Sequence, residues 1–549
     1  MEKYLKQLLD LFEKNAIKTY LILANVILAC FAIWFANVGF LPFKNAGDFG
    51  FFVVLCALLA LYRPGWAFTL FIGSLALENI NLAPVAFGVQ IRPFQLLLTV
   101  LILALLGRYL TKKMPAPKGE FWPKWTWIDL LPVLFVVGGF VSALASVNKG
   151  MSFKQAIVAA SFVGIYFLTR IFVQSFEDLK RIAPFFLSTG VVVCLYAIWQ
   201  NLAFSYGWNS FEVMPGRPNG TFVEADWLGV YIVFLLAIVL SMFHLLRKKS
   251  SIMSCQSSSC VFLYVFLFLI FITLFLTVSR SAWIGAVIVI FGYLKLALFY
   301  GKSDSQKVAG KFWGNFWILM KQKWNWIGWL LEFGKIFLIV LVAVGFIYIF
   351  KLTSFQLGQR AQSTGGLQKI TISCEIGKSA PEKIAKIEEL EAYSCKYINL
   401  EDIDREMLSG RVIQEVSRPD PNVGIRASIY RVVFEQIKSH PVLGTGWGSI
   451  SEILGNDSRG AGLNASNLFL EVWLGSGLIG FLSLVILFGY IFVFSIFSFV
   501  KSKGENFDLV FVMLGLFAII IPNLFNSGIF LGFVWVFLGV AVGLLLNKE

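Results

Sequence analysis

Long apolar runs, each closed by a short polar segment, recur along nearly the whole chain. A run of about eighteen apolar residues can cross roughly 30 Å of hydrocarbon as a helix. Because every backbone polar group inside a membrane must pair internally, such runs form helices rather than open strands. The pattern predicts an all-α polytopic membrane protein with about 12–14 transmembrane helices, at residues 18–37, 49–63, 65–82, 92–111, 128–146, 155–176, 183–206, 226–246, 261–279, 281–300, 335–352, 467–500, 508–524 and 527–547.

One apolar run is longer than a single span requires. Residues 467–500 contain Gly475-Ser476-Gly477 near their beginning. Two glycines this close together weaken a helix, so we expect a short entering helix followed by a spanning one.

One long hydrophilic segment, residues 353–466, interrupts the apolar runs. It divides the chain into an N-terminal bundle of about 11 helices (1–352), the large loop (353–466) and about three C-terminal helices (467–549). We expect the loop to be mainly helical. Its stretch 381–418 is rich in Glu, Lys and Ile and predicts one or two solvated helices. Residues 424–439 predict an amphipathic helix that ends before His440-Pro441.

The basic residues set the orientation of these spans. Cytoplasmic loops of membrane proteins are enriched in Lys and Arg. Placing the N-terminus in the cytoplasm puts most basic clusters, including the run 302–323, on that side. Both termini are then cytoplasmic and the large loop is extracytoplasmic. The short outer loops keep only Lys44, Arg92, Lys149, Lys154, Arg217 and Arg280.

Composition excludes several classes of protein. Hydrophobic residues make up 58% of the chain and charged residues 14%, and the net charge is +14. Since the excess positive charge belongs to the cytoplasmic loops, we expect membrane lipids, and no nucleic acid, as partners. The chain has two histidines and no cluster with metal-ligand spacing, so we expect no metal and no cofactor. Cys374 and Cys395 are the only cysteines of the outer loop, and the sequence leaves open a disulfide or two free thiols.

Three arginines stand at the predicted outer face: Arg217 in the loop 214–222, Arg280 between two spans, and Arg426 at the start of the amphipathic helix. Arginine near hydrocarbon is costly unless it has a partner or reaches water. One interpretation is a cluster of guanidinium groups that binds phosphate in bidentate geometry. The other is snorkelling or helix capping.

Carboxylates collect at the same face. Glu224 and Asp226 follow Arg217, and Glu471 lies within an apolar run. Glu224 and Asp226 could act as bases or pair with the arginines, whereas the cost of burying Glu471 favours a functional role. The glycine-rich segment 444–448 (GTGWG) follows no strand, so we expect a tight turn that approaches a neighbouring helix or ligand rather than a nucleotide site.

Taken in order, these segments resemble the O-antigen ligase and O-antigen polymerase superfamily of bacterial membrane glycosyltransferases. The resemblance covers roughly residues 155–500 and rests on Arg-Pro-Asn-Gly-Thr-Phe at 217–222, Ser-Arg-Ser-Ala-Trp at 279–283, Arg426 with Tyr430, Ser-His-Pro-Val-Leu-Gly-Thr-Gly-Trp-Gly at 439–448, Ala-Ser-Asn-Leu-Phe-Leu-Glu at 465–471 and Gly-Leu-Ile-Gly at 477–480.

The resemblance implies a GT-C-like fold and a metal-independent enzyme of the bacterial inner (cytoplasmic) membrane. Such an enzyme moves a glycan from a polyprenyl diphosphate, such as undecaprenyl diphosphate, to a glycan, lipid or protein acceptor on the outer face. This chemistry belongs to the biosynthesis of lipopolysaccharide and other polysaccharides. By carry-over, Arg217, Arg280 and Arg426 would bind the diphosphate, and a base would take the acceptor proton.

The chain departs from this family at Ser466, where ligases carry a histidine before the asparagine. Serine is no comparable base, so Glu471, Glu224, Asp226 or His440 would take that role, or the acceptor needs none. The departure favours a polymerase or a relative with another acceptor, and leaves a catalytically impaired homologue open. The same sequence could instead belong to a lipid-linked glycan flippase, a peptidoglycan-polymerising enzyme or a structural scaffold.

Overall fold

The computed structural model describes residues 16–111, 122–214, 216–249, 258–298, 326–352, 367–398, 403–419, 421–455, 462–501 and 507–546. The predicted basic run 302–323 lies outside these ranges.

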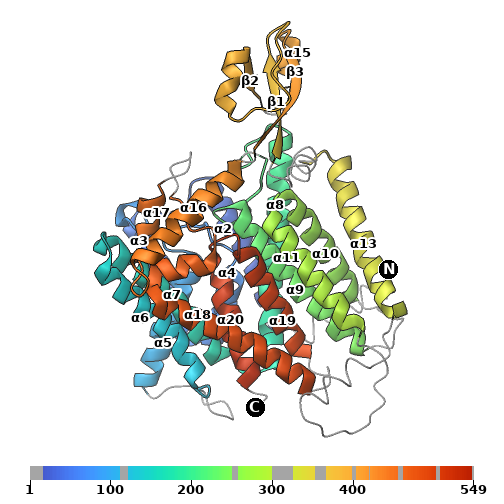
Figure 1. The fold of residues 1–549 in the computed structure, drawn as a ribbon. Coiled ribbons are helices and arrows are strands. Elements are labelled where there is room, and N and C mark those ends of the chain that lie inside the picture. Colours follow the sequence, from blue (N-terminus) through green and yellow to red (C-terminus); the bar gives the residue numbers. More distant parts are fainter. Residues whose placement is uncertain are drawn as a thin grey trace.

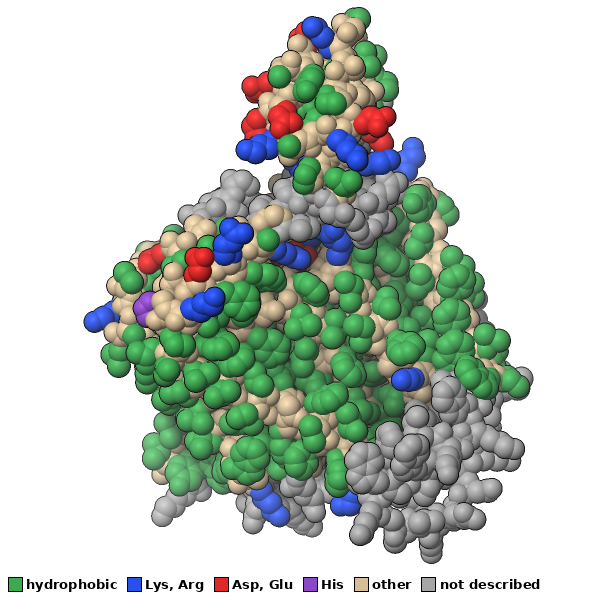
Figure 2. Space-filling view, in the orientation of Figure 1, with side chains coloured by type: hydrophobic (Ala, Val, Ile, Leu, Met, Phe, Trp, Pro, Cys, Tyr) green, Lys and Arg blue, Asp and Glu red, His purple; other side chains and the backbone are tan. Residues whose placement is uncertain are grey.

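Apolar helices form the body of the molecule, and Figure 2 shows them as a broad hydrophobic belt. Within the described ranges, eight helices are long and apolar enough to cross a membrane. The prediction of an all-α polytopic membrane protein is therefore confirmed. The helices of this bundle are α2 (Ala16–Asn37), α3 (Ala46–Tyr62), α4 (Pro64–Ser74), α5 (Pro93–Leu110), α6 (Leu130–Ala145), α7 (Lys149–Phe172), α8 (Phe176–Ser205), α9 (Ala225–Lys249), α10 (Ser258–Leu276), α11 (Arg280–Leu298), α13 (Trp326–Ile349), α18 (Leu468–Lys501), α19 (Phe507–Asn523) and α20 (Gly532–Leu546).

The third predicted span is wrong in length, because α4 ends at Ser74. Its 11 residues reach only about 16 Å at 1.5 Å per residue. The following segment, 75–92, contains one 3₁₀ turn, η1 (Val85–Phe87). Residues 75–84 are mostly buried within the protein, whereas residues 85–90 are exposed. Within the segment, Leu82 N donates to Ile91 O at 2.9 Å. Non-helical backbone at this depth is tolerated when protein covers it.

The long helix α18 is broken where the sequence predicts. Ser476 and Gly477 have non-helical backbone angles, and Gly477 has a φ of +63°. The turn 444–448 approaches this break. Thr445 N and Gly446 N donate to Leu474 O at 2.8 and 3.1 Å. On the other side of the break, Leu478 N donates to Val442 O at 2.9 Å.

Trp447 fills the space between this turn and the bundle. Its side chain is 1% exposed and packs against Phe135 of α6 and Phe530. A Cβ added at Gly475 would overlap the Trp447 ring. A Cβ added at Gly444 would overlap the carbonyl oxygen of Leu474. Glycine therefore allows the turn and the broken helix to touch, and the predicted tight turn against a neighbouring helix is what the structure contains.

A small sheet projects from one end of the bundle (Figure 1). Its strands are β1 (Leu367–Cys374), β2 (Cys395–Tyr397) and β3 (Val412–Pro419), in the antiparallel order β2-β1-β3. A 3₁₀ helix, η3 (Ile387–Tyr393), and α15 (Ile403–Leu408) complete this sheet unit. We call the end of the bundle that carries it the sheet end.

The prediction of one or two solvated helices over 381–418 is therefore only partly right: η3 and α15 lie in that stretch, but β2 and β3 occupy another part of it. Ile370, Ile372 and Val416 are buried between the elements of the unit. Cys374 and Cys395 lie opposite each other on β1 and β2 and are joined by a disulfide. Strand pairing and this cross-link outweigh the helix propensity of the local Glu and Lys residues.

After the sheet unit the chain forms two helices at the sheet end, α16 (Pro421–Ser439) and α17 (Ser449–Leu454). As predicted, α16 ends just before His440-Pro441. It buries Ile429, Val433 and Ile437 against α17 and the first turns of α18.

We predict that Gly475→Ala lowers stability, because the new Cβ overlaps the Trp447 ring, and overpacking a core costs about 1–3 kcal/mol. The matched control is Gly489→Ala on the same helix, where an added Cβ meets nothing within 4 Å. Thermal unfolding of the detergent-solubilised chain measures both. Equal midpoints for the two variants would contradict the close packing of turn and helix.

Candidate functional site

Arg217 lies in the loop between α8 and α9, at the sheet end. Its Nε donates to the carbonyl oxygen of Thr277 at 3.1 Å, and one terminal nitrogen lies 3.3 Å from a carboxylate oxygen of Asp226. Asp226 belongs to the first turn of α9. The guanidinium therefore connects the α8–α9 loop to the end of α10.

Buried polar side chains hold this loop in shape. Gln200 of α8 accepts a hydrogen bond from Gly220 N at 2.7 Å. The Asn219 side chain accepts from Val213 N at 3.2 Å and donates to Phe222 O at 2.6 Å. Thr221 bonds Ala76 O, and its own carbonyl accepts from Asn79 N at 2.8 Å. The loop thus rests on the non-helical segment that follows α4.

Arg280 begins α11, directly after the turn at the end of α10. Thr277, which accepts from Arg217, is three residues before it. Three residues span at most about 11 Å. Arg217 and Arg280 therefore approach the same junction from separate segments. Like Arg217, Arg280 is partly exposed.

Polar residues between α19 and α20 extend this junction toward Glu471. Asn526 donates to Ser281 Oγ at 3.0 Å, and Ser281 Oγ lies 3.2 Å from Ser279 Oγ. The next residue, Ser527, donates to Glu471 Oε2 at 3.4 Å. Glu471 Oε2 also accepts from Ala465 N at 2.7 Å. Both hydrogen bonds reach the same carboxylate oxygen of Glu471.

Ser466 lies between this carboxylate and α16. It has a φ of +49°, uncommon for a residue with a side chain. Its carbonyl accepts from the hydroxyl of Tyr430 at 3.3 Å, and Tyr430 lies one helical turn after Arg426 on α16. The following residue, Asn467, caps α18 by accepting from Phe469 N at 2.9 Å.

A chain of contacts thus connects most of the predicted site residues. It runs from Asp226 and Arg217 through the α10–α11 junction and Asn526 to Glu471, and then from Ser466 to the helix that carries Arg426. Figure 2 shows Lys and Arg side chains gathered at this level, where the apolar belt meets the sheet unit. Glu224 lies beside the chain, where its carbonyl accepts from Leu228 N at 3.1 Å. His440, by contrast, is exposed and lies 3.0 Å from Ser439 Oγ.

The sequence analysis did not single out Asn526 or Ser527. A polar segment between two apolar runs, Pro-Asn-Leu-Phe-Asn-Ser at 522–527, could have identified both residues. Gln200 lies inside an apolar run and gave no such signal.

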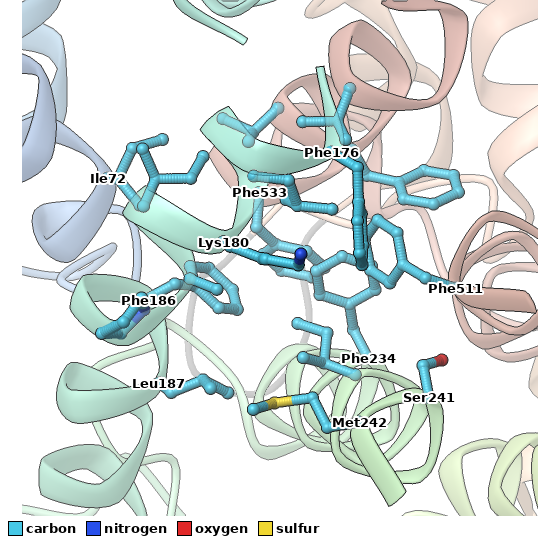
Figure 3. A pocket seen from close by; sticks show the side chains of 18 of the residues that line it. Ile72, Phe176, Lys180, Phe186, Leu187, Phe234, Ser241, Met242, Phe511 and Phe533 are labelled. Atoms are coloured by element: carbon cyan, nitrogen blue, oxygen red, sulfur yellow. The ribbon is translucent and has the colours of Figure 1, made fainter. Parts of the chain in front are cut away.

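An apolar cavity of about 180 Å³ lies elsewhere, among α8, α9, α19 and α20 (Figure 3). Phe186, Phe234 and Phe533 line it, and Lys180 is its one basic lining residue. None of the predicted site residues borders this cavity, and its apolar walls offer little for a diphosphate. We therefore place the candidate site at the contact chain.

Glu212 is a further carboxylate of the α8–α9 loop. Its Oε2 accepts from Gly216 N at 2.9 Å, beside the turn in which Arg217 lies. Its Oε1 is buried and has no hydrogen-bond partner among the described residues. Burial raises the pKa of Glu212 from 4.5 to about 7, against the smaller lowering effect of the hydrogen bonds from Gly216 and Ser210.

This raised pKa predicts a pH-dependent stability. The folded chain holds the Glu212 proton more tightly than the unfolded chain, so its contribution to stability is lost as pH rises from about 4.5 to about 7. Glu212→Gln keeps an acceptor for Gly216 without the charge. We expect its melting temperature to match wild type near pH 5 and to exceed it near pH 8.

Glu435→Gln, an exposed change on α16, is the matched control for this experiment. A difference between Glu212→Gln and wild type that stays constant between these two pH values would refute the titration of Glu212 near neutral pH.

Comparison with known proteins agrees with the resemblance read from the motifs. A family model described as O-antigen ligase matches residues 265–485, about two-fifths of the chain. The match includes Arg280, Arg426, Ser466 and Glu471, and Arg217 precedes it. No curated protein and no solved structure gives a significant match. The family match supports a role in glycan transfer during surface polysaccharide biosynthesis. Through the match at residues 265–485, the comparison supports the O-antigen ligase and O-antigen polymerase superfamily for this multi-pass membrane protein.

Proposed function

We propose that this protein transfers a glycan from a polyprenyl-diphosphate carrier to an acceptor hydroxyl at the sheet end, which we place outside the cytoplasm. The proposal rests on one observation: Arg217 and Arg280 lie at the same junction, between α10 and α11. Two arginines from separate segments reach one place beside a membrane-spanning bundle. Preorganised guanidinium groups suit a diphosphate leaving group, because negative charge grows on it during transfer.

The transfer step balances without a nucleotide. A bond forms between the acceptor oxygen and the anomeric carbon, while the bond from that carbon to the diphosphate oxygen breaks. The electron pair leaves with the diphosphate, where the arginines stabilise it. The acceptor proton must pass to a base. The energy of the reaction comes from the sugar–diphosphate bond.

Glu471 is the base that we propose. Asp226 is engaged with Arg217. Glu471 is held by two hydrogen bonds on one oxygen, Oε2, which orients the second oxygen without using it. It also lies five residues after Ser466, the position at which the ligase motif would carry its histidine. The serine at the family histidine position favours an acceptor other than that of typical ligases, as in a polymerase.

The first test is glycan transfer by the full chain in lipid nanodiscs, from a purified polyprenyl-diphosphate glycan. We expect Arg280→Ala and Arg426→Ala each to lower kcat by about a hundredfold, the usual cost of losing one charge-stabilising donor. Arg431→Ala, an exposed change on the same helix as Arg426, is the control and should keep full activity. Undiminished transfer in both arginine variants would end the assignment.

The second test addresses Glu471. Glu471→Gln keeps an oxygen for Ala465 N and Ser527, so we expect folding to be retained while kcat falls by about 10²–10⁴. KM for the lipid-linked donor should change little, because the loss lies in proton transfer. Transfer kinetics together with thermal unfolding separate the two effects. If kcat stays within about threefold of wild type, Glu471 is not the base.

A further inference from the structure

A second, larger cavity lies among α2, α3, α4 and α5. Its volume is about 850 Å³, within the range of ligand sites. Apolar side chains line most of it, and many are aromatic, including Phe31, Phe35 and Phe52. Helices α2 and α3 both pack against α4, but α2 also packs against α8 and α3 against α5. Residues of both helices line the cavity.

Several of the lining side chains are only partly covered by protein. Leu28, Phe31 and Leu55 border the cavity, yet they remain 52%, 47% and 48% exposed. These residues belong to α2 and α3, which are apolar helices of the membrane bundle. Inside a bilayer, a lipid hydrocarbon chain would cover the exposed part of these side chains.

Charged groups line only one end of the cavity. Lys44 and Asp48 lie there with Asn45, in the connection between α2 and α3 and the first turn of α3. Asn45 donates to Asp48 at 2.7 Å. Deeper inside, Asn25 directs its amide toward α8, where it donates to Thr189 Oγ1 at 2.9 Å. The cavity therefore offers one charged end with both signs and an apolar interior.

The charged end is at the sheet end of the bundle. Phe43 N, next to Lys44, donates to Leu82 O at 3.2 Å, in the segment that supports the Arg217 loop. Leu77 and Leu82 of that segment form a wall of the cavity, while Asn79 bonds Thr221 on the loop side. The segment thus separates the cavity from Arg217. A lipid in the cavity would have its headgroup at Lys44 and Asp48, apart from the candidate diphosphate site.

We propose that this cavity is a binding site for one zwitterionic glycerophospholipid, separate from the lipid-linked donor. An acyl chain fills the apolar interior. The phosphate binds the Lys44 ammonium and the headgroup ammonium binds the Asp48 carboxylate, a match of both charges at the mouth. Because Leu77 and Leu82 line the site, the bound lipid also supports the segment on which the Arg217 loop rests.

Native mass spectrometry of the full chain tests this site, with dioleoyl phosphatidylethanolamine and undecaprenyl phosphate supplied together. We expect the wild-type chain to retain one phosphatidylethanolamine. Lys44→Ala should weaken its retention by about tenfold, through loss of a charge-assisted bond. Ala32→Phe places a ring inside the cavity and should abolish retention.

Two matched controls should retain the lipid as wild type does: Lys149→Ala, an exposed lysine outside the cavity, and Leu103→Phe, on the exposed face of α5. Thermal unfolding verifies that each variant is folded, and Lys44→Ala tests the headgroup contact even if Ala32→Phe fails to fold. Retention of undecaprenyl phosphate in place of phosphatidylethanolamine, or equal retention by wild type and Lys44→Ala, would overturn the proposal. Neither result bears on glycan transfer.

Discussion

The break in α18 is the constraint on which the sheet end of the molecule depends. Interrupting a helix removes partners from backbone groups on both sides, and inside a membrane such groups cost several kcal/mol each. Here the carbonyl of Leu474 and the N–H of Leu478 are both satisfied by the segment 442–446. The loop that returns to the bundle therefore has one place where it can dock. Glycine at 444 and 477 makes the approach possible.

That docking positions the catalytic candidates. The short segment of α18 before the break carries Glu471, and the docked turn is continuous with α16, which carries Arg426. Trp447 fixes the distance from α6 to the docked turn and the short segment of α18, because its ring fills the volume beside Gly475. A site assembled this way draws rigidity from the membrane bundle although most of its residues belong to loops and helix ends. Rigid placement is what electrostatic stabilisation of a leaving group requires.

The sequence predicted the bundle well because a membrane-spanning helix must be apolar over a fixed length, and that property is local. It also predicted the break at Gly475-Ser476-Gly477 and the end of α16 at Pro441, since glycine and proline act on their own backbone. The sheet unit was missed because β1 and β3 pair residues that lie 38 to 52 positions apart in the sequence, and such pairing overrides local propensity. The length of α4 was missed because Leu75, Ala76 and Leu77 continue its apolar run beyond Ser74, before the mostly polar residues at 78–81 interrupt it.

The polar contacts of the site were the hardest part to predict, since each depends on which helices become neighbours. Motifs identified Arg217, Arg280 and Glu471, yet the residues that connect them, Asn526 and Ser527, come from the distant α19–α20 connection. A single polar residue in an apolar run shows that a partner must exist, because leaving it unpaired is costly. Such a residue does not show which helix supplies the partner, and only the packed bundle does.

Because Arg217 is already paired with Asp226, a diphosphate can bind it only if the guanidinium has N–H donors left over. A guanidinium has five N–H donors. Among the described residues, one contacts Thr277, one Asp226 and one the sulfur of Met214. Two donors remain for a phosphate oxygen without loss of these contacts.

Asp226 then works as an orienting partner, because it holds the planar guanidinium group while the lipid-linked glycan donor binds. In the proposed reaction this division separates the two acidic roles. Asp226 would orient the arginine that stabilises the departing charge, and Glu471, on the far side of the α10–α11 junction, would accept the proton. A single carboxylate placed beside Arg217 could not do both, because protonating it would dissolve the pair at the moment when charge develops on the diphosphate.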